Sequence, residues 1–295
     1  MSQFSTEAVF GQVQQSLKNK KYYQALQQLL SISLKCSKDI KFLTFLSETQ
    51  KALHDLNGLI ITQQEIVRQR GLVFDQLNLM RSFYLANKKN EALDIGLKLQ
   101  NDELAAGEDL QLSDLMVRIY LEENDFEGAA EAILKAQNSE SDDFLFWAQG
   151  VVYLNNDQKN HALEYFRRSV QMNPKNDQAW VSLGIMHKDM GDETLFLANI
   201  EKALDLNPYN ASALKLLSHS AAKNIEKVPS TFSRVQFYLA EHCFDEEISL
   251  CHFQLLCGTR NWKWAELEAE KLVLNEPQNE TFKNLKKTMG EARSL

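Results

Sequence analysis

The chain has 295 residues, of which 44% are hydrophobic and 24% charged, so it is long enough to enclose a sizeable core. It contains only 11 glycines and 4 prolines, too few for a turn-rich β protein or for Gly-rich phosphate loops, and this composition indicates mostly helix. The formal net charge of −8 argues against nucleic acid as the main partner, because affinity for a phosphate backbone depends on basic surface.

The chain carries no pattern typical of export or of membrane insertion. Residues 1–20 lack a basic stretch followed by an apolar one and a small-residue cleavage site. No window approaches roughly eighteen consecutive apolar residues, so we expect no membrane span. The cysteines, Cys36, Cys243, Cys251 and Cys257, are few and unevenly placed, which fits reduced thiols. We therefore predict a cytoplasmic protein.

Glycine and proline recur at a fixed period in the second half of the chain. Gly150 corresponds to Gly184 and Pro174 to Pro208, each pair 34 residues apart, within the similar phrases QMNPKNDQAW and DLNPYNASAL. A repeat of this length is typical of architectures in which one supersecondary unit is copied along the chain.

The residues around each glycine have helical spacing. Phe146, Gly150 and Tyr153 lie at i, i+4 and i+7 on one helix face, while Ala162 and Phe166 mark the facing side of a second helix. Small residues at this contact let two helices approach closely. A single helix hairpin cannot bury its apolar face, so the pattern predicts that neighbouring hairpins stack into a solenoid.

The small residue of the second helix extends the period over nearly the whole chain. Its steps are 34, 33, 37, 33, 34 and 69 residues, in the series Ala25, Leu59, Ala92, Ala129, Ala162, Phe196 and Ala265. Because the last step covers two periods, we expect a degenerate unit between them. The predicted units are residues 6–39, 40–72, 73–109, 110–142, 143–176, 177–210, 211–245 and 246–279, with a polar capping helix over 280–295. The pattern is broken at Leu59, at Phe196 and at Pro229.

This pattern resembles the tetratricopeptide repeat (TPR) family, whose repeat reads Trp-x2-Leu-Gly-x2-Tyr, then Ala-x3-Phe, then Pro. The match is strongest in units 143–176 and 177–210. The resemblance implies an all-α fold, a right-handed superhelical α-solenoid of about eight TPR hairpins plus a C-terminal capping helix, and it implies a role in binding other proteins.

In the TPR family, positions 2, 5, 9 and 12 of the first helix of each repeat line the concave side, and helix geometry puts them on one face. Here these positions have an apolar centre with polar residues on either side. The residues expected to contact a partner are Arg81, Tyr84, Asp114, Arg118, Leu121, Trp147, Val151, Val181, Ile185, Lys188, Lys215 and His219. The alternative is that a tight superhelix buries Trp147 and Val181 between helices.

One group of residues resembles a metal site, namely His242, Cys243, Cys251, His252 and Cys257. Structural zinc sites favour cysteine pairs two to four residues apart, whereas Cys251 and Cys257 are six apart and lie on different helix faces. We interpret these residues as buried thiols and a hydrogen-bonded histidine. No metal and no cofactor is therefore predicted.

Nucleotide-binding, metalloprotease and serine-hydrolase motifs are missing from the sequence, and we predict that the protein is not an enzyme. The leading hypothesis is a protein-interaction scaffold or adaptor that binds a partner peptide or helix in its concave groove. Asn78 and Arg81 form only a fragment of the two-carboxylate clamp found in cochaperone members of the TPR family.

Two other hypotheses remain open. In the first, the chain is a subunit of a larger secretion, envelope or motility assembly, bound through convex or terminal faces. Homo-oligomers formed through the terminal units are compatible with it. The second is an enzyme or metalloprotein centred on the residues near Cys251.

Overall fold

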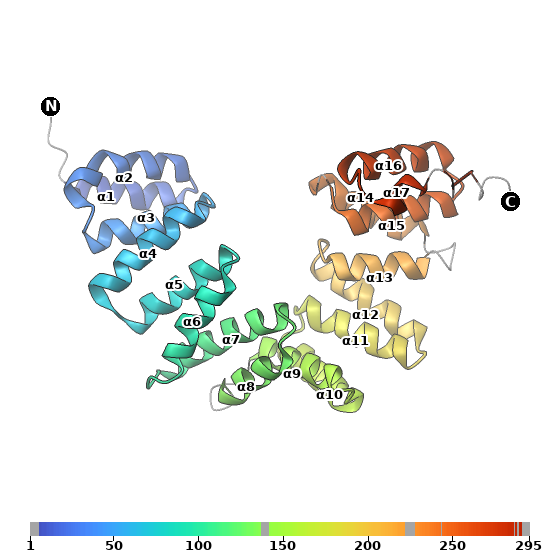
Figure 1. Ribbon diagram of the computed structural model, residues 1–295, viewed down its shortest axis with the longest axis horizontal. Helices are drawn as coiled ribbons and strands as arrows, with labels where there is room; N and C mark the ends of the chain where they lie inside the picture. Colours follow the sequence, from blue (N-terminus) through green and yellow to red (C-terminus); the bar gives the residue numbers. More distant parts are fainter. Residues whose placement is uncertain are drawn as a thin grey trace. The chain divides into compact units, whose positions relative to one another are not determined.

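The computed structural model describes residues 6–136, 142–221, 228–242, 244–285, 287, 289 and 290. Over these residues the chain forms helices and no strand (Figure 1). The helices are α1 (Thr6–Lys18), α2 (Tyr22–Cys36), α3 (Ile40–Ala52), α4 (Leu56–Arg70), α5 (Val73–Leu85), α6 (Lys89–Leu99), α7 (Ala106–Glu122), α8 (Phe126–Ala136), α9 (Asp143–Asn155), α10 (Lys159–Met172), α11 (Asp177–Asp189), α12 (Glu193–Leu206), α13 (Ala211–Ala221), α14 (Val228–Glu241), α15 (Glu246–Gly258), α16 (Trp262–Asn275) and α17 (Glu280–Lys283).

The helices pack as consecutive antiparallel hairpins, from α1 with α2 to α15 with α16. The chain divides into two compact units, Met1–Ser141 with α1 to α8 and Asp142–Leu295 with α9 to α17. Within each unit, one hairpin packs on the next through helices such as α2 and α3 or α10 and α11. The prediction of an all-α stack of TPR hairpins is confirmed. The arrangement of all the repeats in one continuous solenoid stays a prediction.

The stretch assigned to the capping helix has its first turns described. Phe282, Leu285 and Met289 are buried against residues of α15 and α16, among them Phe253 and Leu272. These side chains cover apolar surface that a further repeat would otherwise bury. Residues 286, 288 and 291–295 of the predicted cap lie outside the described part of the chain.

Each described turn inside a hairpin contains one residue with left-handed backbone geometry. These residues have φ between +56° and +80° and are Lys20, His54, Asn87, Asn124, Asp157, Gly191 and Arg260. Their spacing follows the period of the repeat. In each turn the next residue donates its N–H to the carbonyl five residues back, as Asp55 does to Gln50 at 2.9 Å, which ends the first helix and reverses the chain. The corresponding turn of the seventh repeat lies within residues 222–227, outside the described part.

Small residues set the distance between the two helices of a repeat. A Cβ added to Gly150 would lie 2.5 Å from the ring of Phe166, and one added to Gly184 would lie 2.8 Å from Cδ1 of Ile200. Both of these partners are fully buried. The glycines therefore allow α9 to pack directly on α10, and α11 on α12.

The three departures from the repeat pattern are absorbed locally. Leu59 and Phe196 are both buried in the packed interior, and the Phe196 carbonyl lies 3.4 Å from where a Cβ on Gly184 would be. Pro229 falls in the first turn of α14, where a backbone N–H has no partner within the helix and proline is tolerated.

In the fifth and sixth repeats, asparagines connect the start of one repeat to the start of the next. Asn173 and Asn176, in the turn after α10, donate to Asp143 Oδ2 at 3.0 and 2.8 Å. Asp177 Oδ2 accepts the corresponding two hydrogen bonds from Asn207 and Asn210 in the turn after α12, each at 2.8 Å. The two asparagines within each of the similar phrases QMNPKNDQAW and DLNPYNASAL therefore make this link.

We expect Gly150→Ala to lower the free energy of unfolding by about 1–3 kcal/mol, because its methyl group must displace the Phe166 ring in a close-packed contact. Gly107→Ala in α7 is the matched control, since nothing lies within 4 Å of its added Cβ. Chemical denaturation measures both variants. Equal stability of the two variants would contradict the close approach.

We expect His54→Gly to raise the free energy of unfolding by about 1 kcal/mol, because a left-handed residue with a Cβ is strained by about 1–2 kcal/mol and glycine is not. Asn87→Gly should raise it less, since asparagine tolerates this geometry. Thermal midpoints of the two variants test this, and a lower midpoint for His54→Gly would contradict it.

Candidate functional site

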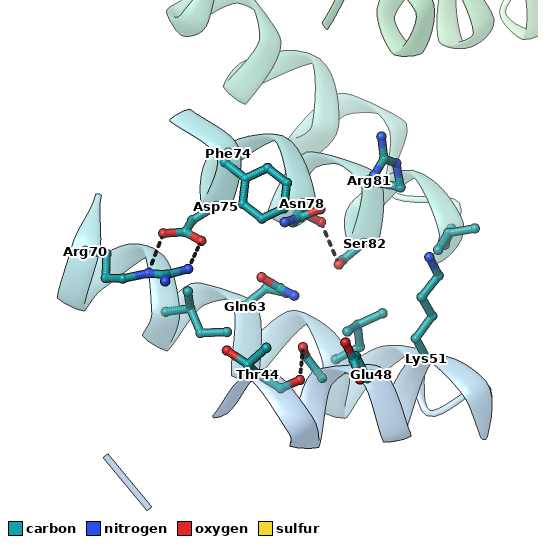
Figure 2. Close-up of a pocket in the computed structure, with 14 residues that line it drawn as sticks. Thr44, Glu48, Lys51, Gln63, Arg70, Phe74, Asp75, Asn78, Arg81 and Ser82 are labelled. Atoms are coloured by element: carbon teal, nitrogen blue, oxygen red, sulfur yellow. Dashed lines mark hydrogen bonds and ion pairs between the residues drawn. The ribbon is translucent and has the colours of Figure 1, made fainter. Parts of the chain in front are cut away.

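A cavity of about 240 Å3 lies between α3, α4 and α5 in the first unit (Figure 2). We call it the α3–α5 pocket. Its lining combines apolar, amide and charged side chains, namely Thr44, Ser47, Glu48, Lys51, Leu59, Gln63, Ile66, Arg70, Phe74, Asp75, Asn78, Arg81, Ser82 and Leu85. The α3 and α5 residues come from the first helices of two successive repeats, and the α4 residues from the second helix between them.

An ion pair closes one end of the pocket. Arg70, at the end of α4, donates from Nε to Asp75 Oδ2 at 2.9 Å and from Nη2 to the other carboxylate oxygen. Asp75 is 1% exposed and lies in the first turn of α5, where the helix dipole also favours a negative charge. A planar two-point contact of this kind fixes orientation as well as charge. The pair therefore holds α4 against α5, and its charges cancel.

Two amide side chains in the pocket have no partner within the described protein. Gln63 is 8% exposed, and its side chain makes no hydrogen bond to any described residue. The side chain of Asn78 is likewise unpaired there. Only the main-chain carbonyl of Asn78 accepts a hydrogen bond from a side chain, that of Ser82 Oγ at 2.8 Å. Figure 2 shows the two amides extending from α4 and α5 toward the space between the helices. Neither amide is among the fully buried polar atoms that lack a partner in the described residues, so both are open to solvent or to a ligand.

Charged side chains, among them Lys51 and Arg81, lie at the end of the pocket away from this ion pair (Figure 2). Among the described residues, no ion pair engages Glu48, Lys51 or Arg81. Phe74 is 54% exposed and Leu85 is 44% exposed, so the lining also presents apolar side chains to the surface. The α3–α5 pocket therefore offers apolar surface, free charge and free amides together.

Arg81 is the one predicted contact residue that lines this pocket. The other predicted residues of the first unit lie farther along its helices. Tyr84 donates to Glu122 at 2.5 Å, and Arg118 donates to Asp114 at 3.0 Å from both Nε and Nη2. Leu121 is half-buried. These polar groups are engaged with one another across α5 and α7.

The local charges perturb Tyr84. Burial raises the pKa of Tyr84 to about 12, and the hydrogen bond and negative charge of Glu122 add to the effect. Lys89 lies 3.0 Å from Glu122 and 2.7 Å from Glu123, and these carboxylates raise the pKa of its ammonium group. The cluster is a structural link between neighbouring repeats.

In the second unit, burial reduces the number of predicted apolar contact residues that a partner could reach. Val181 is 6% exposed and belongs to the core, so it offers little surface to a partner. Trp147, Val151 and Ile185 are half-buried, and Trp147 Nε1 donates to Ser182 Oγ at 2.9 Å. Of the two residues that the alternative expected to be buried between helices, Val181 is buried and Trp147 is half-buried.

The polar residues predicted in the second unit reach the surface. Lys188 is exposed, with its Nζ 5.0 Å from the centre of the Phe196 ring. Lys215 forms an ion pair with Glu247, and His219 is exposed. A binding role for the predicted residues of either unit stays a prediction.

Three residues of α3 were missed in the sequence. Positions 2, 5, 9 and 12 of this helix are Lys41, Thr44, Glu48 and Lys51, and the last three line the pocket. Extending the same rule to the second repeat would have found them. Gln63 comes from the second helix of a repeat, where the rule assigns no contact positions.

Of the residues considered for a metal site, Cys251, His252 and Cys257 lie on α15, and His242 follows α14. Cys243 lies outside the described residues, and among those described no three His, Cys, Asp or Glu side chains are arranged to hold a metal ion. Burial raises the pKa of the Cys251 and Cys257 thiols. Burial opposes ionisation of Glu268 on α16, but His252, with Nδ1 at 3.2 Å, holds its pKa below the usual value.

Tyr84 supplies a test of the local geometry. The unfolded pKa is 10.0 and the folded one about 12, so the stabilising contribution is present below pH 10 and is lost as pH rises toward 12. Glu122→Gln should lower the pKa of Tyr84 without restoring 10.0, because burial is the larger cause. Tyrosine ring NMR, assigned with Tyr84→Phe, measures it. An unchanged pKa in Glu122→Gln would contradict the contact.

Among the described helices, none has the length and hydropathy needed to cross a bilayer.

Comparison with known structures supports the fold. The crystal structure of the APC/C hetero-tetramer Cut9-Hcn1 superposes with a TM-score of 0.65 at 13% identity, over 91% of this chain and 52% of that chain. Pseudomonas aeruginosa PilF matches with a TM-score of 0.58 at 15% identity, over 73% of this chain and 97% of PilF.

A curated relative matches a shorter stretch. Cellulose synthase operon protein C of Escherichia coli K12 is 30% identical over 92 residues, which is 30% of this chain and 8% of that protein. This chain therefore spans a small part of that relative and about half of the Cut9 complex chain it matches. The family model described as anaphase promoting complex subunit 8 / Cdc23 matches residues 76–243, more than half of the chain. The protein belongs to this family and is built from tetratricopeptide repeats.

Proposed function

We propose that the protein is a non-catalytic scaffold that binds a peptide segment or helix of a partner protein on the first-helix face of its repeats. A TPR fold supports the general role, because family members with this architecture bind other proteins. The observation that carries the finer proposal is the α3–α5 pocket, where free amides, free charges and exposed apolar side chains meet.

The unpaired amides and the exposed phenylalanine of the α3–α5 pocket support this proposal. The side chains of Gln63 and Asn78 have no hydrogen-bond partner among the described residues, and Phe74 is 54% exposed. A bound segment that covers Phe74 would gain from apolar burial, and it could pair with the two amides.

A second candidate function is that of a subunit held in a larger assembly through the second helices of the repeats. Exposed apolar side chains on α16 favour it, since Trp264 is 59% exposed, Leu267 47% and Leu274 80%. They lie at a spacing of three and seven residues, on one helix face. The matched family is named for a subunit of a complex, and the Cut9 structure is a hetero-tetramer.

A cytoplasmic location belongs to the same proposal. Cys36, Cys251 and Cys257 are free thiols. Free thiols are typical of a reducing compartment.

Site-specific photo-crosslinking tests where the partner binds. A photoreactive residue at position 78 in the α3–α5 pocket should crosslink the partner in native lysate, whereas one at Leu134, exposed on α8, should not. Phe74→Ala combined with Arg81→Ala should reduce capture about tenfold while leaving helicity unchanged.

Crosslinks obtained only at Leu267 on α16 would favour the assembly-subunit function instead. Unchanged capture by the folded double variant would refute binding at the α3–α5 pocket.

A further inference from the structure

Exposed apolar side chains gather on the second helices of the first two repeats. Tyr23, Leu30 and Leu34 of α2 are 77%, 59% and 100% exposed. They are seven and four residues apart, so they lie on one face of the helix. Ile61 of α4 is 67% exposed and lines the same cavity of about 580 Å3 as Leu30. The cavity joins the two helices into one apolar surface, which we call the α2–α4 surface.

Basic residues flank this surface, and the segment that carries it contains no acidic residue. Residues 8–38 include Lys18, Lys20, Lys21, Lys35 and Lys38 and no aspartate or glutamate, although the whole chain has a net charge of −8. Lys20 and Lys21 lie just before α2, Lys35 lies in its last turn and Lys38 just after it. All five lysines are exposed. Positive charge therefore brackets the apolar face of α2 at both ends.

The acidic residues next to this segment are already engaged. Glu7 forms an ion pair with Lys41 at 2.7 Å, and Asp39 accepts from two backbone N–H groups at the start of α3. On α4, Glu65 contacts Arg68 at 3.4 Å. Among the described residues, no ion pair engages the five lysines around α2. Their charge is therefore available to a negatively charged partner.

We propose that the α2–α4 surface binds the anionic phospholipid surface of a membrane, with its apolar side chains among the lipids and its lysines at the headgroups. Helices that lie in a membrane interface combine an apolar face with basic residues beside it. The negative potential of an anionic leaflet attracts lysines that lie close to it. The inference goes beyond the scaffold role and does not depend on it, because it uses second helices and not the α3–α5 pocket.

The choice of lysine favours a lipid surface over an acidic protein. Interfaces between proteins are enriched in arginine and depleted of lysine, yet residues 1–67 contain no arginine. Arginine binds a carboxylate at two fixed points, whereas lysine is a point charge on a flexible stem. That stem can lie along apolar surface while the ammonium group stays in the polar layer. Lysines without arginine therefore suit a layer of mobile headgroups.

The apolar face also suits the interfacial layer of a bilayer. Tyrosine is enriched there because its ring is apolar and its hydroxyl is polar, and Tyr23 lies near Lys21 at one end of α2. Leu30 and Leu34 supply aliphatic side chains toward the other end. Tyr23 and Leu34 are separated by about 16 Å along the helix axis, so α2 lies along the bilayer surface when all three side chains contact it.

Co-sedimentation of the full chain with lipid vesicles tests the proposal. The probes are vesicles of phosphatidylcholine alone and vesicles of phosphatidylcholine and phosphatidylserine in a ratio of about two to one. We expect the chain to bind the mixed vesicles at least about tenfold more tightly than the neutral ones. This advantage should shrink as the salt concentration rises, because salt screens the attraction between lysines and headgroups.

Variants assign the contacts to the two kinds of side chain. Lys20→Gln combined with Lys21→Gln should weaken binding to the mixed vesicles about 25-fold, since each lysine near the surface contributes about fivefold. Leu34→Ala should weaken it about tenfold and leave the thermal midpoint unchanged, because Leu34 is fully exposed. The matched controls are Lys202→Gln on α12 and Leu134→Ala on α8, exposed residues outside the surface, and both should bind normally.

Failure to bind the mixed vesicles, or equal binding to mixed and neutral vesicles, would overturn the proposal. Unchanged binding by folded Leu34→Ala would do the same. A dimer in sedimentation velocity without vesicles, dissociated by Leu34→Ala, would assign the surface to a second copy of the chain. A photoreactive residue at position 34 that captures an acidic protein, in a chain that ignores vesicles, would assign it to protein docking. Crosslinking at position 78 tests the scaffold function separately from all of these results.

Discussion

The close contact between the two helices of a repeat is the constraint on which the rest of the structure depends. Gly150 against Phe166 and Gly184 against Ile200 bring paired helices together, and a left-handed residue such as Asp157 reverses the chain between them. Once these two features recur at the repeat period, each hairpin has an apolar side that only the next hairpin can cover. Stability then comes from contacts between neighbouring hairpins.

A pocket lined by polar and charged side chains lies among these packed helices. Packing uses the small and apolar positions of each helix, which leaves positions such as Glu48, Lys51 and Arg81 free of structural duties. In the α3–α5 pocket the ion pair of Arg70 with Asp75 holds two helices in place while its charges cancel. The remaining amides and charges are the groups that would contact a partner in the proposed function.

The sequence predicted the fold well because its evidence is local and repeated. Period, glycine position and turn residues all act within a single hairpin, so each repeat reports the same structure independently. Of the residues predicted to contact a partner, Arg81 lines the α3–α5 pocket, and Gln63, which also lines it, was not among them. Val181 was placed on an accessible stripe, but helix packing in the second unit buries it. Burial depends on how neighbouring helices approach, and helical spacing specifies only which residues share a face.

By itself, the sequence determined that this protein is all helical, built from hairpins of a tetratricopeptide type, and supplied with uncommitted polar residues at regular positions. Only the tertiary structure decided which of these residues meet. Thr44 on α3, Gln63 on α4 and Phe74 on α5 come from separate helices, and no pattern along the chain joins them. Whether a polar side chain finds a partner or remains free depends on three-dimensional neighbours, because hydrogen bonds and ion pairs act over a few ångströms in space and not over sequence distance.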